Sequence, residues 1–532
     1  MLRISLPTAW LDEIQPTLQD LITDKVASRI SQKDFTLWGE PAESESRIRL
    51  GWVDAASNSL SLISDLAELK STFSAAGINR IVLCGMGGSS LAPEVISKKY
   101  GVQIEILDST SPEQLNEVIS QGVQHTAVVV SSKSGSTVET DSQKRLFEDL
   151  FAKAGISRTE RIIIVTDPGS PMDQAARQDG YRVFNADPNV GGRYSALTAF
   201  GVVPSYLAGV PVEELLNQAL STKYLAEDSS ENPALILGAL LAALPGLNGP
   251  RDKVGILADQ ITLPGFADWA EQLIAESTGK DEKGILPIAL TEQSPELTAN
   301  FGDVVLITVS ADENYSDAFG ALVTGNLAEQ FMLWEYATAV ASRLIQVNPF
   351  DQPDVESAKV AARGMLSNKA VLNSPSLTDS GISATFLGSQ IGKDESVKSL
   401  LSDLLGKVHD DGYIAVHAYL NRKSDLPVEE IVRLLVKKTN RPVTFGWGPR
   451  FLHSTGQYHK GGPRTGVFLQ LVAETQDDLA VPTREFSFAE LIRSQAEGDG
   501  QVLADLGRPV LRLGLSNPKS DFARLIELIE EI

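Results

Sequence analysis

Short apolar runs alternate with helix-like stretches from residue 80 onward. The first five runs, between residues 80 and 187, are "RIVLCG", "VQIEILD", "TAVVVSS", "RIIIVTD" and "YRVFNAD". Runs this short and apolar indicate strands that are buried on both faces, and their alternation with helices predicts a parallel, doubly wound sheet. Ligands bind beyond the carboxyl ends of the strands in such sheets, so the loops that follow the runs are candidate binding sites.

The same pattern divides the whole chain into four parts. Apolar spacings of three and four predict helices in the first part, and "KVGILAD", "GILPIAL" and "DVVLITVS" start a second strand–helix unit that weakly repeats the first. A further set of strands and helices begins near residue 400 with "GYIAVHAYL". The predicted fold class is therefore α/β, with an N-terminal helical segment (1–75), two doubly wound parallel-sheet domains (76–250 and 251–399) and a C-terminal α/β segment (400–532).

Composition narrows the classes of partner. The chain has 532 residues, 42% of them hydrophobic, and a formal net charge of -23. That charge argues against nucleic acid and anionic membranes as partners, and it means that an anionic substrate needs a local basic site. The single cysteine, Cys84, excludes an internal disulfide and fits a reducing compartment. With no signal-peptide pattern and no apolar stretch of membrane-spanning length, we expect a cytoplasmic protein.

Hydroxyl side chains crowd the exit of the third predicted strand, in "SSKSGSTVET" (131–140). The spacing of Ser136 and Glu139 matches a capping box, so a helix beginning at Ser136 is one interpretation. The other is an anion cradle: Gly135 lets the backbone approach closely, the helix N-terminus offers N–H groups, and the hydroxyl groups add donors. The two interpretations are compatible, and together they suit a phosphate monoester.

A second glycine loop, "GMGGSS" (85–90), follows the first strand. It nearly matches the dinucleotide fingerprint G-x-G-x-x-G, but Ser90 stands at the sixth position, and Asp108 lies about where a ribose-binding acid would be expected. A nicotinamide enzyme is thus an alternative. Two such loops on neighbouring strands fit one small phosphorylated ligand better than a dinucleotide.

Glu276 is the most informative carboxylate. In "FADWAEQLIAESTGK" it falls within the helical stripe of Phe266, Trp269 and Leu273. A carboxylate on the apolar side of a helix, near its C-terminus, loses solvation and faces the negative end of the helix dipole, and both effects favour a general base. The alternative is a helix-end glutamate that turns back to solvent.

Other candidates carry weaker signals. Gln352 and Lys359 in "NPFDQPDVESAK" share a helix face, and Arg193 follows two glycines in "NVGGRYSAL". Two of the five histidines, His453 and His459, fall in "FLHSTGQYHKGGP", which we expect to be a loop between strands. No cysteine–histidine cluster has the spacing of a zinc site.

Taken in order, "GMGGSSLAP", "SSKSGSTVET", "VGGRYS", "AESTGK" and "NPFDQPDVESAK" resemble phosphoglucose isomerase and its sugar-isomerase (SIS) domains. "FADWAEQLIAESTGK" and "HSTGQYHKGGPRTG" are most similar to the isomerase half of bifunctional transaldolase/phosphoglucose isomerases. The resemblance implies two SIS-type domains and an aldose–ketose isomerase that interconverts glucose 6-phosphate and fructose 6-phosphate through a cis-enediol, without a metal or organic cofactor. A (β/α)₈ barrel needs about 250 residues, and only about 75 precede the first strand, so we expect no transaldolase activity.

The resemblance also implies residue roles. Glu276 matches the family's base and Arg193 the arginine that stabilises the enediolate. Gln352 and Lys359 match the glutamine and lysine near the phosphate and the ring oxygen, and Lys359 is counted among the catalytic residues. Gly88 and Ser89 are expected beside the substrate, and the residues expected around its phosphate are Ser132, Lys133, Ser134 and Thr137.

The chain departs from the family at one point, because no histidine lies between Glu276 and Lys359 to open the sugar ring. The later loop can supply one, and we take His459 first and His453 second.

Three alternatives stay open at the level of the sequence. Another sugar phosphate, such as mannose 6-phosphate, could be the substrate, because tolerance at C2 depends on the shape of the pocket. A non-catalytic SIS regulator would keep the serine loops, but it has no need for Glu276 or Arg193. The family commonly dimerises, so a homodimer is one expectation, and a C-terminal segment that replaces the partner's contribution is the other.

Overall fold

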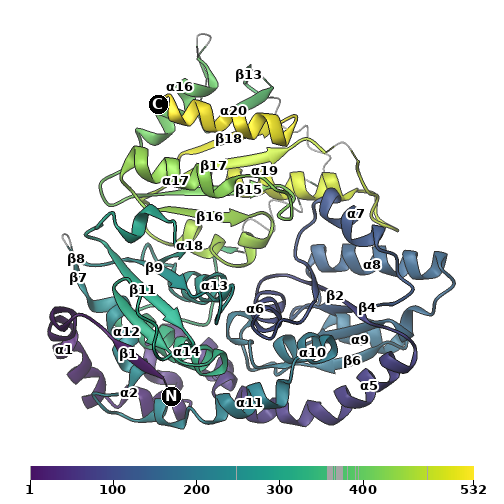
Figure 1. Ribbon diagram of the computed structural model, residues 1–532, viewed down its shortest axis with the longest axis horizontal. Helices are drawn as coiled ribbons and strands as arrows, with labels where there is room; N and C mark the ends of the chain where they lie inside the picture. Colours follow the sequence, from purple (N-terminus) through teal and green to yellow (C-terminus); the bar gives the residue numbers. More distant parts are fainter. Residues whose placement is uncertain are drawn as a thin grey trace.

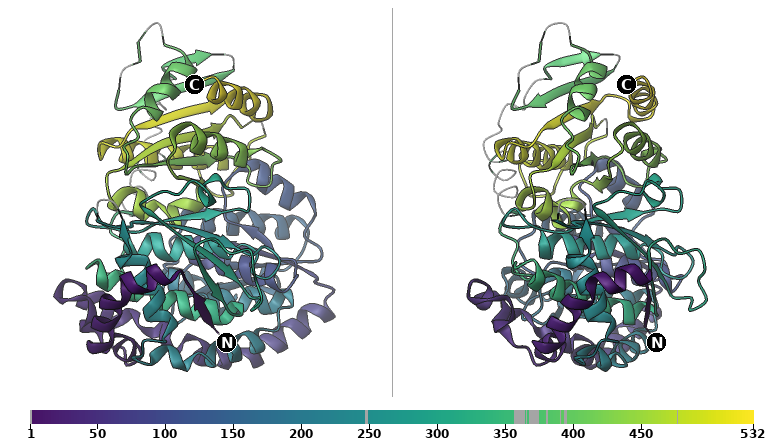
Figure 2. Two further views of the ribbon diagram at one scale, coloured as in Figure 1. Left: turned by 60° about the vertical axis from the view of Figure 1, so that its left-hand side comes forward. Right: turned by 90° about the vertical axis from the view of Figure 1, so that its left-hand side faces the viewer.

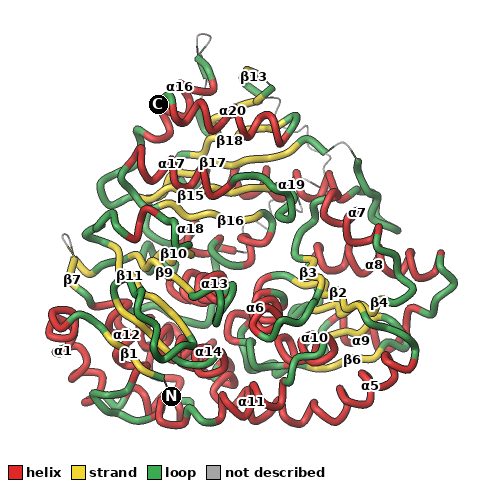
Figure 3. The backbone as a smooth tube through the Cα atoms, in the orientation of Figure 1, coloured by secondary structure: helices red, strands yellow, loops and turns green. Residues whose placement is uncertain are grey.

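Three β-sheets form the frame of the molecule. The computed structural model describes residues 2–246, 249–355, 364, 366, 375–379, 381–389, 391–392, 395–475 and 477–532. In the view of Figure 1 the sheets lie at the corners of a rough triangle: the first at the right, the second at the left and the third at the top. Helices accompany every sheet (Figure 3), and the prediction of an α/β fold class is confirmed.

The first sheet is parallel throughout, in the order β3-β2-β4-β5-β6. Successive residues of β4 alternate between two cores: Ala127 and Val129 pack in one, Val128 and Val130 in the other. Both faces are therefore covered, as the apolar runs predict. The elements are β2 (Arg80–Gly85), α6 (Leu91–Lys99), β3 (Glu105–Leu107), α7 (Pro112–Ser120), β4 (Thr126–Ser131), α8 (Val138–Lys153), β5 (Ile162–Thr166), α9 (Pro171–Gln178) and β6 (Arg182–Asn185).

Helices connect the first sheet to the second and form the base of the molecule, with the N-terminal helices packed against them (Figure 2). Trp52 of the N-terminal segment is fully buried and stacks on Tyr194, with the ring centroids 5.3 Å apart. The helices are α1 (Thr8–Thr23), α2 (Val26–Ser31), α3 (Glu43–Arg49), α4 (Ala55–Ser59), α5 (Ile63–Ala75), α10 (Ala199–Ala208), α11 (Val212–Leu220), α12 (Pro233–Ala243) and α14 (Leu327–Leu344).

The second sheet has the order β1-β12-β11-β9-β10, and only β1 is antiparallel to its neighbour. Residues 1–75 were predicted to contain only helices, and this is wrong for Arg3–Ser5, which form β1 at the edge of the second sheet. Three residues are too few to show a strand period in the sequence. The elements are β1 (Arg3–Ser5), β9 (Lys253–Ala258), α13 (Phe266–Thr278), β10 (Leu286–Leu290), β11 (Val304–Ser310) and β12 (Ala321–Thr324), and a small hairpin pairs β7 (Pro245–Gly246) with β8 (Gly249–Pro250).

The third sheet has six strands in the order β13-β14-β18-β17-β15-β16, of which the last four are parallel. Its first two strands lie in sequence before residue 399, inside the range predicted for the second domain. The elements are β13 (Leu377–Asp379), β14 (Ile382–Leu387), α16 (Val397–Leu405), β15 (Tyr413–Tyr419), α17 (Val428–Thr439), β16 (Val443–Trp447), α18 (Gly456–Gly461), β17 (Gly466–Ala473), α19 (Phe488–Asp505), β18 (Val510–Leu515) and α20 (Pro518–Glu530).

We call each sheet together with the helices beside it a unit, numbered like the sheet. A buried ion pair joins α18 to α19 in the third unit. Lys460 Nζ lies 2.6 Å from Asp499 Oδ1, and both side chains are almost fully buried. Burial by itself would raise the pKa of Asp499, but Lys460 and His417 outweigh it and hold the pKa well below its usual range.

Among the helices that the structure describes, none is long and apolar enough to cross a membrane.

The pair leads to a prediction about stability. Asp499→Ala leaves the Lys460 ammonium buried without its partner, so we expect the free energy of unfolding to fall by about 3–5 kcal/mol in urea titrations at neutral pH. An unfolded aspartate titrates near pH 4, so this contribution should be lost as the pH falls below about 4. Asp505→Ala, on the exposed end of the same helix, should cost less than about 0.5 kcal/mol. Equal losses for the two variants would contradict the assignment.

Candidate active site

Two turns of the first unit, each containing glycine, are in direct contact in the candidate site. Gly88 lies in the turn that follows β2, and Gly192 lies in the turn that carries Arg193. A Cβ atom on Gly88 would come within 1.9 Å of the Gly192 carbonyl oxygen. Only glycine at position 88 permits this approach, so the "GMGGSS" loop fixes the position of the turn before Arg193.

Arg193 joins this turn to the second unit. Its side chain is 2% exposed, and its Nη1 donates to the carbonyl oxygens of Glu276 (2.9 Å) and Pro349 (3.0 Å). Its Nη2 donates to the side-chain oxygen of Gln352, so Arg193, Glu276 and Gln352 meet at one point. Arg193 Nε lies 3.3 Å from Glu276 Oε2, and the guanidinium therefore faces the carboxylate directly.

Glu276 occupies the last turn of α13, on the side of the helix that Arg193 reaches. The side chain is 12% exposed, which fits the predicted position on the apolar stripe. Gln272, one turn earlier, donates from Nε2 to Glu276 Oε2 (3.2 Å) and to the carbonyl oxygen of His453 (2.8 Å). One amide group thus holds both the carboxylate and the backbone of a third-unit segment.

His453 comes from that third-unit segment and reaches the first unit. Its Nε2 lies 3.0 Å from Glu139 Oε1, and the same oxygen accepts from Gln495 Nε2 at 2.7 Å. A carboxylate only accepts, so this contact places the proton on Nε2 and leaves Nδ1 to exchange a proton with a ligand. Within the described residues Nδ1 has no hydrogen-bond partner, and the side chain is 15% exposed.

The contact of Glu139 corrects the predicted capping box. The helix α8 begins at Val138, its N-cap is Thr137, and no side chain caps it. Glu139 is buried and turned toward His453 and Gln495 instead of the helix N-terminus. Spacing alone could not reveal this, because both partners lie more than 300 positions away in the sequence.

The loop before α8 is held by hydrogen bonds among its own residues. Ser132 Oγ contacts Thr137 Oγ1 (3.1 Å) and accepts from the backbone N–H of Gly135 (3.2 Å), while Ser134 stays exposed. Lys133 Nζ pairs with Asp167 Oδ2 at 2.6 Å, so its ammonium group lies at the edge of the loop. Burial lowers the pKa of Lys133, against the opposing effect of Asp167.

The structure separates the two candidate histidines. His459 is 1% exposed, stacks on Tyr413 and bonds the Tyr413 hydroxyl through Nδ1 (3.0 Å). Burial lowers the pKa of His459 well below its usual value, so the ring is neutral. The expected loop is in fact the short turn Arg450–His453 followed by α18. That helix turns His459 into the core of the third sheet, whereas His453 contacts Glu139 through its ring and Gln272 through its carbonyl oxygen.

Lys280 is a buried cation that the sequence analysis did not single out. Its Nζ donates to the carbonyl oxygen of Asn348 (2.5 Å) and to Asp351 Oδ1 (2.7 Å), and burial lowers its pKa to about 8. It fixes the segment that carries Gln352. The lysine of "AESTGK" follows Glu276 by four residues, a spacing that could have drawn attention to it. Lys359 lies outside the described residues.

Ser89 is the other residue of the glycine turn after β2 that the sequence analysis singled out. Ser89 is 8% exposed and follows Gly88 in the same turn. In the part of the chain that the structure describes, no group of three or more histidine, cysteine, aspartate or glutamate side chains could hold a metal ion.

Comparison with known proteins assigns this constellation to a family. The model of the phosphoglucose isomerase family matches residues 66–291, which include both glycine turns, the serine loop, Arg193 and Glu276. Residues 66–291 are similar to the phosphoglucose isomerase family. The match ends before the third sheet begins.

Relatives of the phosphoglucose isomerase family cover more of the chain. Glucose-6-phosphate isomerase of Geobacter sulfurreducens is 25% identical in an alignment of 388 residues, and the match covers 61% of this chain and 73% of the relative. The enzyme of the same name from Cyanothece sp. is 27% identical in an alignment of 383 residues, and the match covers 60% of this chain and 72% of the relative. The crystal structure of a glucose-6-phosphate isomerase from Chlamydia trachomatis has the same fold, with a TM-score of 0.54 and 20% identity over 70% of this chain and 89% of that one.

The contact between the two glycine turns can be tested by a single methyl group. Gly88→Ala forces the methyl against the Gly192 carbonyl, and we expect the free energy of unfolding to fall by about 1–3 kcal/mol. Gly191→Ala is the matched control, because a Cβ atom at that neighbouring position meets nothing within 4 Å. Urea denaturation of both variants measures the difference, and a Gly88→Ala variant as stable as Gly191→Ala would show that the turns do not need this close approach.

Proposed function

We propose that the chain is an aldose–ketose isomerase that interconverts glucose 6-phosphate and fructose 6-phosphate through a cis-enediol intermediate. The observation that carries the proposal is the pairing of a largely buried carboxylate, Glu276, with the Arg193 guanidinium at 3.3 Å. The names of the relatives support the same substrate pair. The proposal needs no cofactor, because the chain's own side chains supply a base, a cation and a second proton donor.

In the proposed reaction the sugar ring opens first. His453 exchanges a proton with the ring oxygen or the anomeric hydroxyl through Nδ1, while Glu139 holds Nε2 and keeps the ring oriented. Glu276 then removes the proton from C2, and the electron pair forms the enediol double bond as the C1 carbonyl oxygen takes up charge. A proton then passes from the C2 hydroxyl to O1, and return of the proton from Glu276 to C1 leaves a carbonyl group at C2, which gives the ketose.

Arg193 stabilises the charge that develops on the oxygens. Its Nη atoms are held by backbone carbonyl groups, so little reorganisation is needed when the charge appears. The phosphate would bind at Ser132, Ser134 and Thr137, with Lys133 adding positive charge at the edge and with Gly88 and Ser89 beside the sugar. Gln352 would bind the substrate near Arg193, and Lys359 keeps the predicted role near the ring oxygen.

The alternatives differ in what they require of the site. A regulator that only binds a sugar phosphate would not need a carboxylate placed 3.3 Å from a buried guanidinium. An isomerase of mannose 6-phosphate would use the same groups, but the named relatives favour the glucose series. A homodimer and a cytoplasmic location stay predictions.

The base is tested by Glu276→Gln. The amide keeps the size of the side chain but cannot accept the C2 proton, so turnover of fructose 6-phosphate in a coupled glucose-6-phosphate dehydrogenase assay should fall by about 10²–10⁴-fold. The variant should still bind the sugar phosphate. A wild-type chain that binds fructose 6-phosphate without converting it would overturn the proposed function, and the regulator would take its place.

The two histidines give a second prediction. His453→Asn should lower kcat by about 10²–10⁴-fold, because it removes the proposed proton donor, while Gln495 still donates to the Glu139 carboxylate. His459→Asn should instead lower the free energy of unfolding by about 1–3 kcal/mol, since it leaves the buried Tyr413 hydroxyl without its partner. Measurement of kcat and of urea denaturation on both variants separates the roles. Loss of activity confined to His459→Asn would restore the first assignment.

A further inference from the structure

A cluster of buried charges lies next to the site and joins the third unit to the first. Arg450 Nη1 lies 2.6 Å from Glu94 Oε2 and 2.7 Å from Asp108 Oδ2. Arg422 approaches the same two carboxylates, with Nη1 3.2 Å from Glu94 Oε1 and Nε 3.0 Å from Asp108 Oδ1. Two arginines from the third unit thus pair with two carboxylates from the first.

All four groups are removed from water. The side-chain exposure is 0% for Asp108, 10% for Glu94, 11% for Arg450 and 16% for Arg422. Burial would raise the pKa of Glu94, but Arg450, Arg422 and Lys98 hold it well below its usual range, so the carboxylate is charged. Without Arg450, the two buried carboxylates keep only Arg422, with Lys98 beside Glu94, so part of their charge loses its partner and the segment that carries residue 450 loses its ion pairs.

Arg450 differs from Arg422 in the segment that it belongs to. Arg450 starts the turn that ends at His453, so only two residues lie between the arginine of the ion cluster and the proposed proton donor. The far end of this turn is held by the bond from Gln272 to the His453 carbonyl, and Gly87 lies close enough that a Cβ on it would come within 2.6 Å of that oxygen. Arg422 follows β15 and lies outside this turn.

We propose that Arg450 is a positioning residue for ring opening: its ion pairs with Glu94 and Asp108 place the turn Arg450–His453 so that the His453 ring meets Glu139 and the substrate. This inference rests on the proposed function. The role of Arg450 is indirect, since it acts through His453 and does not touch the reacting atoms.

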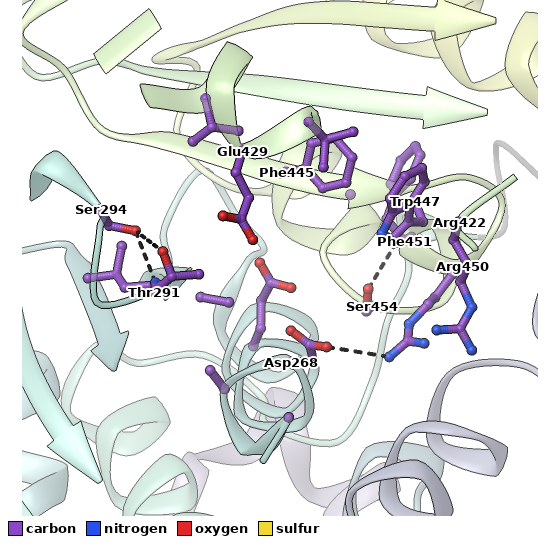
Figure 4. A pocket seen from close by; sticks show the side chains of 18 of the residues that line it. Asp268, Thr291, Ser294, Arg422, Glu429, Phe445, Trp447, Arg450, Phe451 and Ser454 are labelled. Atoms are coloured by element: carbon purple, nitrogen blue, oxygen red, sulfur yellow. Dashed lines mark hydrogen bonds and ion pairs between the residues drawn. The ribbon is translucent and has the colours of Figure 1, made fainter. Parts of the chain in front are cut away.

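The surroundings of Arg450 make the position suitable for substitution. Arg450 and Arg422 line a cavity of about 420 Å³ on the side of α13 that Asp268 occupies (Figure 4). Arg450 Nη2 lies 3.7 Å from Asp268 Oδ2 across this cavity. A shorter or uncharged side chain therefore has room without displacing the backbone.

The test compares Arg450→Met with a matched arginine. Arg441 also joins the third unit to another unit, through an ion pair with Asp303, and its side chain is 13% exposed, but it lies before β16 and not in the turn. Arg441→Met therefore loses a comparable ion pair between units but leaves the turn Arg450–His453 and its contacts unchanged. Arg450→Lys restores the charge without the second donor group.

Ring opening and isomerisation are measured separately. The interconversion of the α and β anomers of glucose 6-phosphate, followed by NMR exchange, needs ring opening but not the base, so Glu276→Gln should keep it and His453→Asn should lose it. We expect Arg450→Met to lose enzyme-catalysed anomerisation and to lower kcat on the order of 10²-fold with little change in KM, because the phosphate loop belongs to another segment. Arg450→Lys should recover part of both, and Arg441→Met should keep both.

Two results would overturn the inference. One is anomerisation by Arg450→Met at the wild-type rate, and the other is an equal loss in Arg441→Met, which would mark a general effect of the contact between units. If the wild-type chain does not act on glucose 6-phosphate, the proposed function fails, but the effect of Arg450 on the position of His453 can still be measured by NMR. The His453 ring signals in ¹H–¹⁵N spectra should shift in Arg450→Met but not in Arg441→Met, and unchanged signals would exclude the positioning role.

Discussion

The buried guanidinium of Arg193 is the constraint on which the candidate site depends. A guanidinium cannot lose its charge in a protein, so each of its donors must find an acceptor when it leaves water. The acceptors come from the end of α13 and from the segment before residue 353, and these segments must therefore converge on the turn that Gly88 supports. Glu276 is placed next to Arg193 as a consequence of this convergence.

The third sheet completes the arrangement by the same principle. Charged groups meet where it contacts the first unit: Arg450 and Arg422 pair with Glu94 and Asp108, and His453 pairs with Glu139, beside an apolar contact that Phe488 makes with the core of the first unit. The chain as a whole has a formal net charge of -23, so local cations near the serine loop matter for an anionic substrate. The proposed site therefore combines groups from three units of one chain.

The sequence predicted what depends on local pattern. The strands of the first sheet follow from their short apolar runs, and the side of α13 that carries Glu276 follows from the helical spacing of three and four residues. Contacts over long distances in the sequence could not be predicted: Glu139 lacks its predicted capping role, β1 joins a remote sheet, and His459 turns into a core. Each of these outcomes depends on a partner more than 40 positions away, which no local pattern contains.

The central claim is that Glu276 transfers the C2 proton through an enediol. It is tested most directly by turnover of fructose 6-phosphate in D₂O, without added metal, with the glucose 6-phosphate product examined by NMR. A carboxylate that holds the proton between C1 and C2 exchanges part of it with solvent, so the account predicts deuterium at C2 of the product. Product formed at full rate with no deuterium at C2 would indicate a direct hydride shift and would contradict the account.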